Sequence, residues 1–164
     1  MNEIYLGKIV NTHGIKGEVR IISDFELKNQ VFKKDFNLYV GRDRVKLPIN
    51  SYRPHKNYDM VTFVGITDIN EVLVYKGEPV YINREDLEIS DYILKDLIGL
   101  EVYNKEHLVG TIDEIINNGA HKILVVKSGK RKNLIPFVDD FISDVDINGK
   151  KVFINEIEGL INED

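Results

Sequence analysis

The sequence contains no cysteine among its 164 residues. That absence excludes disulfides, thiol nucleophiles and thiolate metal sites, and it suits a reducing compartment. No apolar run approaches the length of a membrane span, and no basic-then-apolar secretion signal opens the chain. We therefore expect a cytoplasmic protein that does not contact a membrane.

Signatures of catalysis and of metal binding are missing as well. The sequence has no Gly-x-x-x-x-Gly-Lys-Ser/Thr phosphate loop, no Gly-x-Ser-x-Gly nucleophile motif and no His-Glu-x-x-His zinc motif. The four histidines fall in four separate predicted loops, whereas a zinc site needs three or four converging ligands. A calcium-like string starts at Asp144, but its twelfth position is Asn155 and not the closing glutamate. We predict no catalytic residues, no metal ligands and no cofactor.

The charge is divided unevenly along the chain. Residues 1–83 carry 12 basic and 10 acidic side chains, whereas residues 84–164 carry 10 basic and 17 acidic ones. A half this acidic would repel a phosphate backbone and would complement a basic protein partner. Solubility alone is the simpler explanation of the same acidic excess.

Short β-type runs separated by turn residues fill most of the sequence. The first half adds two short helical patterns, over residues 25–34 and from Asp68 to about Tyr75, the latter opening with a capping box. In the second half the strongest hairpin signal is the turn at Asn148-Gly149. Strands at this spacing predict a mainly β fold of two small β-barrel domains, over residues 1–83 and 92–164, joined by a short acidic linker over 84–91.

The most distinctive segment of the sequence is the loop between the first two predicted strands. Gly14 and Gly17 lie three apart, which favours backbone positions with a positive φ or a close approach. Ile15 between them is either buried or offered to a partner. Read alone, the loop is a shaped surface whose His13 and Lys16 suggest either catalysis or phosphate binding.

Two further features suggest contacts with other molecules. Basic residues in the first half lie near Tyr52 and Tyr58, a combination that can hold phosphate and stack on unpaired bases, although they form no basic stripe. In the second half, Tyr92 and the apolar run Leu134–Val138 serve either a partner or packing between the domains. Pro136 confines that run to a sheet edge or a strand end.

The whole chain resembles the RimM family of ribosome maturation factors. The segments that carry the resemblance, in collinear order, are Gly7–Arg20, Gly65–Glu71, Tyr75–Gly77, Asp96–Gly99, Gly119-Ala120, Leu124–Val126, Leu134–Phe137 and Glu158–Leu160. The resemblance implies an N-terminal barrel like those of translation factors and reductases, followed by a PRC-barrel. It also implies a non-catalytic assembly factor that binds the immature 30S ribosomal subunit and promotes 16S rRNA processing and maturation of the 30S head.

The resemblance also implies a protein contact of the second domain. The second domain would engage ribosomal protein S-nineteen of the head, through candidate residues Tyr92, Ile93, Leu97, Ile98, Pro136 and Phe137. The weakly basic charge of the first domain separately suggests at most a weak contact with 16S rRNA, through the candidate loop residues Thr12, His13, Gly14, Lys16, Gly17 and Arg20. Two departures stand out: Ile93 replaces the second of the family's paired tyrosines, and His121-Lys122 replaces its Asn-Asp.

Two other readings stay open at this point. A reductase-like barrel would also suit a flavin- or nucleotide-binding enzyme, although fold analogy carries little function by itself. A PRC-type adaptor serving an unrelated protein partner is the other alternative. For the assembly factor we expect a monomer.

Overall fold

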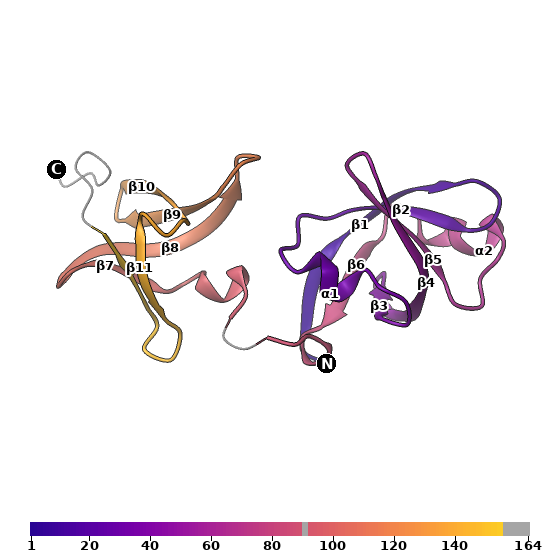
Figure 1. Ribbon diagram of the computed structural model, residues 1–164, viewed down its shortest axis with the longest axis horizontal. Coiled ribbons are helices and arrows are strands. Elements are labelled where there is room, and N and C mark those ends of the chain that lie inside the picture. The colour runs from indigo at the N-terminus through magenta and orange to yellow at the C-terminus, as the bar shows by residue number, and fades with distance from the viewer. Residues whose placement is uncertain (90–91, 156–164) are drawn as a thin grey trace. The chain divides into compact units, whose positions relative to one another are not determined.

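The computed structural model describes residues 1–89 and 92–155. The chain forms two compact units, Met1–Glu88 and Ile89–Asp164. Figure 1 shows that both are built mainly from strands. The predicted mainly β fold with two domains is therefore confirmed.

The first unit is a closed barrel of six strands in the order β1-β2-β5-β4-β3-β6. Hydrophobic residues alternate along its strands, so that one face of each strand fills the barrel and the other faces outward. The elements are β1 (Glu3–His13), β2 (Glu18–Ile22), α1 (Lys28–Val31), β3 (Asn37–Val40), β4 (Val45–His55), β5 (Tyr58–Phe63), α2 (Ile69–Val72), η1 (Leu73–Tyr75), β6 (Pro79–Asn83) and η2 (Arg84–Asp86).

The predicted second helix is present as α2 followed by the 3-10 turn η1. The Asp68 side chain caps α2 by accepting a hydrogen bond of 2.9 Å from the backbone N–H of Asn70. The helical segment ends before Gly77, whose φ of +86° is easily reached only by glycine. The first helical pattern gives only the four residues of α1.

The chain after β6 continues in the first unit. Residues 84–86, expected in the linker, form η2, and the backbone N–H of Arg84 donates to the carbonyl of Asn2. The Gln30 side chain both donates to and accepts from the backbone of Glu88, at 2.9 and 2.8 Å. With this boundary the first unit carries 13 basic and 13 acidic side chains, and the second carries 9 basic and 14 acidic ones. The difference in charge between the units is smaller than the division at residue 83 suggests.

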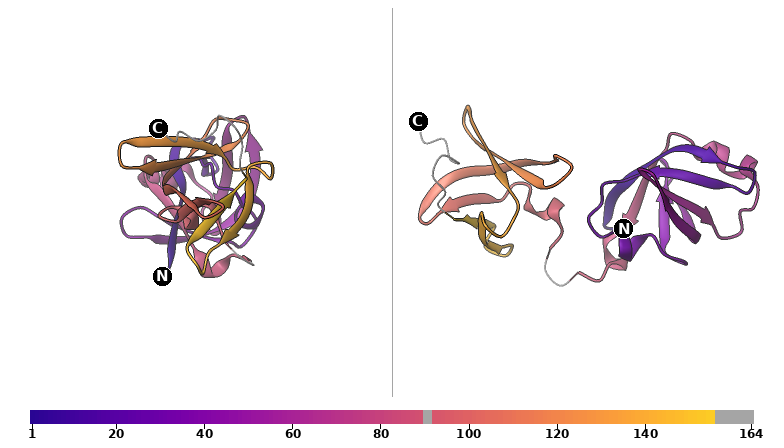
Figure 2. Two further views of the ribbon diagram at one scale, coloured as in Figure 1. Left: turned by 90° about the vertical axis from the view of Figure 1, so that its left-hand side faces the viewer. Right: turned by 45° about the horizontal axis from the view of Figure 1, so that its top comes forward.

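The second unit contains a six-stranded sheet in the order β10-β9-β8-β7-β12-β11. β12 runs parallel to β7, and the other neighbours are antiparallel. Figures 1 and 2 show the long strand β8 curving along its length. The elements are η3 (Leu94–Leu97), β7 (Glu101–Asn104), β8 (His107–Asn117), β9 (Lys122–Ser128), β10 (Arg131–Pro136), β11 (Ile142–Asp146) and β12 (Lys151–Ile154).

The predicted turn at Asn148-Gly149 joins β11 and β12, which pair from Asp146 and Lys151 onward. The Asp146 carboxylate accepts a hydrogen bond of 2.9 Å from the backbone N–H of Gly149. This acidic side chain therefore stabilises a turn. Within residues 1–89 and 92–155, no three His, Asp or Glu side chains gather closely enough to hold a metal ion. In the same residues, no helix is long and apolar enough to cross a membrane.

Candidate binding surfaces

The loop between β1 and β2 has the backbone that its glycines predict. Gly14 and Gly17 have φ of +69° and +86°. A Cβ added at Gly17 would lie 3.3 Å from the carbonyl oxygen of Asp68, so this glycine also allows a close approach. The carbonyl of Ile15 accepts a hydrogen bond of 3.1 Å from the N–H of Ile69, which ties the loop to α2. The Ile15 side chain is 81% exposed and is thus presented to solvent.

Two polar side-chain pairs lie next to the loop, Arg20 with His13 and Arg53 with Glu18. Arg20 Nη2 lies 3.0 Å from His13 Nδ1, so Nδ1 accepts and the guanidinium donates. The same guanidinium lies 5.6 Å from the centroid of the Tyr58 ring, within cation–π range. Arg53 makes a bidentate contact with Glu18, at 2.9 and 2.8 Å, and holds the pKa of that carboxyl below its usual value. Glu18 neutralises Arg53. Next to the loop, an anion could therefore bind to Arg20 and to the exposed Lys16.

The structure brings several of the predicted loop residues together. A hollow of about 310 Å³ is lined by His13, Gly14, Ile15, Lys16, Glu18 and Thr62. Arg20 joins this group through His13. Thr12 pairs with Val19 in the β1–β2 ladder and is half-buried, and Gly17 is buried. These last two residues shape the loop and present little surface of their own.

Two of the predicted protein-contact residues belong to the core of the second unit. Ile93 is 1% exposed and Leu97 is fully buried, so neither side chain can contact a partner. The prediction is wrong for these two residues because Leu97 of η3 joins the sheet's hydrophobic cluster and Ile93, directly before η3, is buried as well. Tyr92 and Phe137 are partly buried and pack against the same cluster. Ile98, at 48% exposed, and the partly exposed Pro136 remain accessible.

An apolar surface that the sequence analysis missed lies on the outer face of β8, β9 and β10. In register, Ile116 pairs with Ile123 and Ile123 with Pro136, while Val125 pairs with Leu134. We call these five residues the outer strip. Leu134 is 48% and Ile116 39% exposed and Pro136 is partly exposed, whereas Ile123 and Val125 of the strip are buried, at 9% and 1%. The alternate positions on β9 and β10 are buried on the side of the core. The missed signal is the unbroken apolar run of β9, which is typical of a strand covered on both faces.

Each of the two units matches a known family of domains. Residues 4–87 match the RimM N-terminal domain, and residues 94–160 match the RimM PRC barrel domain. The chain belongs to the RimM family. Its sequence is 36% identical to the ribosome maturation factor RimM of Exiguobacterium sp., covering 100% of this chain and 99% of that one. It is 39% identical to the protein of the same name from Streptococcus pneumoniae (strain Hungary19A-6), covering 100% of each.

A crystal structure described as a putative 16S ribosomal RNA processing protein RimM from Pseudomonas aeruginosa is 25% identical. It covers 95% of this chain and 98% of that one, with a TM-score of 0.47. Of the segments that carry the RimM resemblance, Glu158–Leu160 lies outside the residues that the structure describes.

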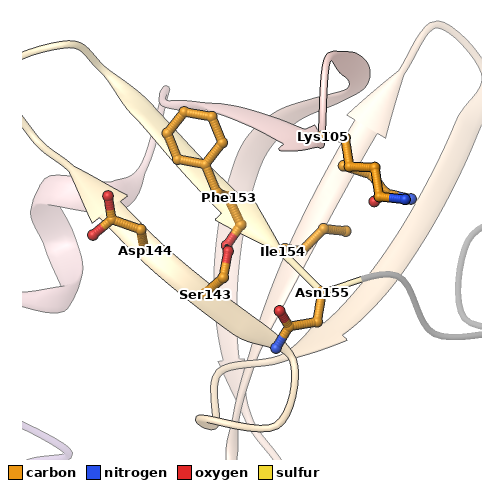
Figure 3. Close-up of a pocket in the computed structure, with 7 residues that line it drawn as sticks. Lys105, Ser143, Asp144, Phe153, Ile154 and Asn155 are labelled. Carbon is orange, nitrogen blue, oxygen red and sulfur yellow. The ribbon is translucent and has the colours of Figure 1, made fainter.

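A second hollow, of about 460 Å³, lies where β7, β11 and β12 of the RimM PRC domain come together. Its lining residues are Asn104, Lys105, Ser143, Asp144, Phe153, Ile154 and Asn155. Figure 3 shows Ser143 next to the backbone of Phe153, and the Ser143 hydroxyl donates to that carbonyl at 3.1 Å. The Asn155 amide donates to the carbonyl of Asp140. These two polar groups therefore stabilise the local backbone.

Proposed function

We propose that this protein assists maturation of the small ribosomal subunit by binding, without catalysing a reaction. It binds the immature 30S subunit as a monomer and promotes 16S rRNA processing and maturation of the 30S head. The observation that carries this proposal is the match of both units to RimM domains. In addition, relatives named ribosome maturation factor RimM align with the chain over essentially their whole length.

The second unit contacts ribosomal protein S-nineteen of the head in this proposal. The accessible residues of the outer strip, Leu134, Ile116 and Pro136, support it, because exposed apolar side chains grouped on a folded domain commonly mark a protein contact. Charge supports it too, since this unit has 9 basic and 14 acidic side chains and ribosomal proteins are typically basic. The direct contacts are Ile98, Pro136, Leu134 and Ile116. Tyr92 and Phe137 pack partly buried against the core cluster and contribute less area to the contact.

The first unit makes a weak contact with 16S rRNA in this proposal, through the β1–β2 loop. Its basic and acidic side chains are equal in number, so the field of the whole unit does not attract RNA. Lys16 and Arg20 supply about two phosphate contacts. Such a contact lowers the logarithm of the binding constant by about 2 per tenfold rise in salt. A weak contact suits a factor that must leave once the head has folded.

The mechanism is a shift of population. A protein that binds the partly folded head more tightly than competing conformers favours that state by the ratio of its two affinities.

The test is co-sedimentation of the purified protein with immature and mature small subunits, at about 50 and 200 mM salt. We expect stronger binding to the immature subunit, with a shallow salt dependence. Failure to sediment with either subunit would contradict the proposal. A steep salt dependence that disappears in Lys16→Ala/Arg20→Ala would instead mean that RNA contacts dominate binding.

A further inference from the structure

Three outward-facing tyrosines form a transverse row on the first unit. Tyr5 of β1 pairs with Tyr81 of β6, and Tyr81 pairs with Tyr39 of β3. Their neighbours along each strand are buried in the barrel, so the three rings share its outer face. The Tyr5 and Tyr81 rings meet edge to face, with centroids 5.9 Å apart at an interplanar angle of 74°. Tyr5 itself is 54% exposed.

A guanidinium group is held against this row. The Cζ of Arg44 lies 3.7 Å from the centroid of the Tyr81 ring. Glu3 receives two of its hydrogen bonds, from Nε at 2.7 Å and from Nη2 at 3.0 Å. Nη1 donates to the carbonyls of Gly41 and Arg42, at 2.8 and 3.3 Å. With every nitrogen engaged, the planar cation is fixed in place before any ligand arrives.

The backbone at this arginine has an uncommon conformation. Arg44 closes the turn between β3 and β4 with a φ of +51°, in the left-handed region that non-glycine residues seldom adopt. Its side chain is still 31% exposed. The turn therefore presents a rigid guanidinium whose position is set by Glu3 and Tyr81.

We infer that the tyrosine row and Arg44 form a stacking platform for unpaired bases of single-stranded RNA. Bases stack on tyrosine rings and on arginine planes, and such stacking tolerates any base because each has a π face. Platforms of this kind combine aromatic rings with cations that follow the phosphates.

Charge at the platform favours RNA over a protein partner. Lys46 pairs with Tyr39 at the end of the row, and the exposed Arg42 and Lys8 lie on the adjoining turn and strand. Three acidic residues belong to the same strands and turns: Glu3 to β1, Asp43 to the β3–β4 turn, and Glu78 to the position directly before β6. Glu3 is engaged by Arg44, which leaves the cations in excess.

This inference adds to the first unit a second RNA contact, separate from the β1–β2 loop, and its relevance to the ribosome rests on the proposed function. The test below uses an oligonucleotide alone, so its failure leaves subunit binding untouched.

The experiment measures fluorescence anisotropy of a labelled single-stranded oligouridine titrated with the full chain. Tyr5→Ala should weaken binding about tenfold, because one stacked base is lost, while Tyr5→Phe should bind as the unchanged protein does. The Tyr5→Ala factor should be the same at about 50 and 200 mM salt, whereas Lys46→Ala should reduce the salt dependence. Thermal unfolding of each variant shows that the barrel is intact.

The matched control is Tyr58→Ala. Tyr58 is a half-exposed tyrosine on β5 beside the β1–β2 loop, and its ring lies near the Arg20 guanidinium, as the Tyr81 ring of the row lies near that of Arg44. Loss of oligonucleotide binding in Tyr58→Ala but not in Tyr5→Ala would confine RNA binding to the loop and overturn the platform. Unchanged oligonucleotide binding in Tyr5→Ala, with weakened subunit binding, would assign the row to a protein partner and also overturn it.

Discussion

Leu134 is the most exposed side chain of the outer strip and gives the sharpest test of that surface. Full burial of a leucine side chain contributes about 1.5–3 kcal/mol relative to exposure. Because Leu134 is already about half covered, a partner that covers the rest gains about 1 kcal/mol from it. Leu134→Ala should therefore weaken subunit binding by about fivefold.

Leu134→Asp should have a larger effect than the alanine variant. The partner would then bury an unpaired carboxylate, which adds a desolvation cost, so binding should weaken by at least about tenfold. The position lies on the exposed side of an edge strand, so we expect little change in thermal stability.

Leu108→Asp is the matched control. Leu108 belongs to the same unit and is 47% exposed, but it pairs with Tyr103 at the β7–β8 hairpin, outside the outer strip. We expect its binding to the subunit to be unchanged. Equal losses in the two aspartate variants, or normal binding by Leu134→Asp, would refute the assignment of the outer strip.

Three further predictions concern stability and pH. Leu97→Ala should cost about 2–5 kcal/mol, because Leu97 is fully buried in the second unit, and an unchanged melting temperature would contradict its placement. Arg53 lowers the pKa of Glu18, so the pair's contribution is present above the usual value of 4.5 and lost as the pH falls through the lower folded-state pKa. Denaturant titrations at acid pH should show this loss, and Arg53→Gln should reduce it; an identical acid profile in the variant would refute the pairing. Burial and the hydrogen bond to Asp59 raise the pKa of Tyr52 from 10.0 to about 12, so stability should fall as the pH rises across that interval. Tyr52→Phe should lack this alkaline loss, and its persistence there would assign the loss to another group.

The parts of the fold that depend on local sequence were predictable. Alternation of apolar residues predicts the strands, Asp68 predicts the start of α2, and Asn148-Gly149 predicts a turn that the structure contains. These features depend on neighbours a few residues apart, and a single sequence records them directly.

Features set by long-range register were not predictable. Leu97 lies in the short 3-10 turn η3 and Ile93 directly precedes it, so no period shows which side is buried. The outer strip needs the pairing of β8, β9 and β10, and the tyrosine row needs the closure of the barrel. Tyr5, Tyr39 and Tyr81 lie far apart in the chain, so no spacing rule joins them.

The charge of each unit depends on where the boundary between the units lies. Residues 84–88 contribute one basic and three acidic side chains, and the structure places them in the first unit. The first unit is consequently neutral, which suits a platform that holds bases by stacking better than a surface that binds phosphate by charge.

The central claim is that this protein acts by preferring the immature small subunit. Its most direct test is a measurement of the dissociation constants for immature and mature 30S subunits under the same salt conditions, by co-sedimentation of the full chain. The account predicts tighter binding to the immature subunit, with the preference reduced in Leu134→Asp and kept in Leu108→Asp. Equal affinity for the two subunits would contradict it, because a protein that binds both states equally shifts no population.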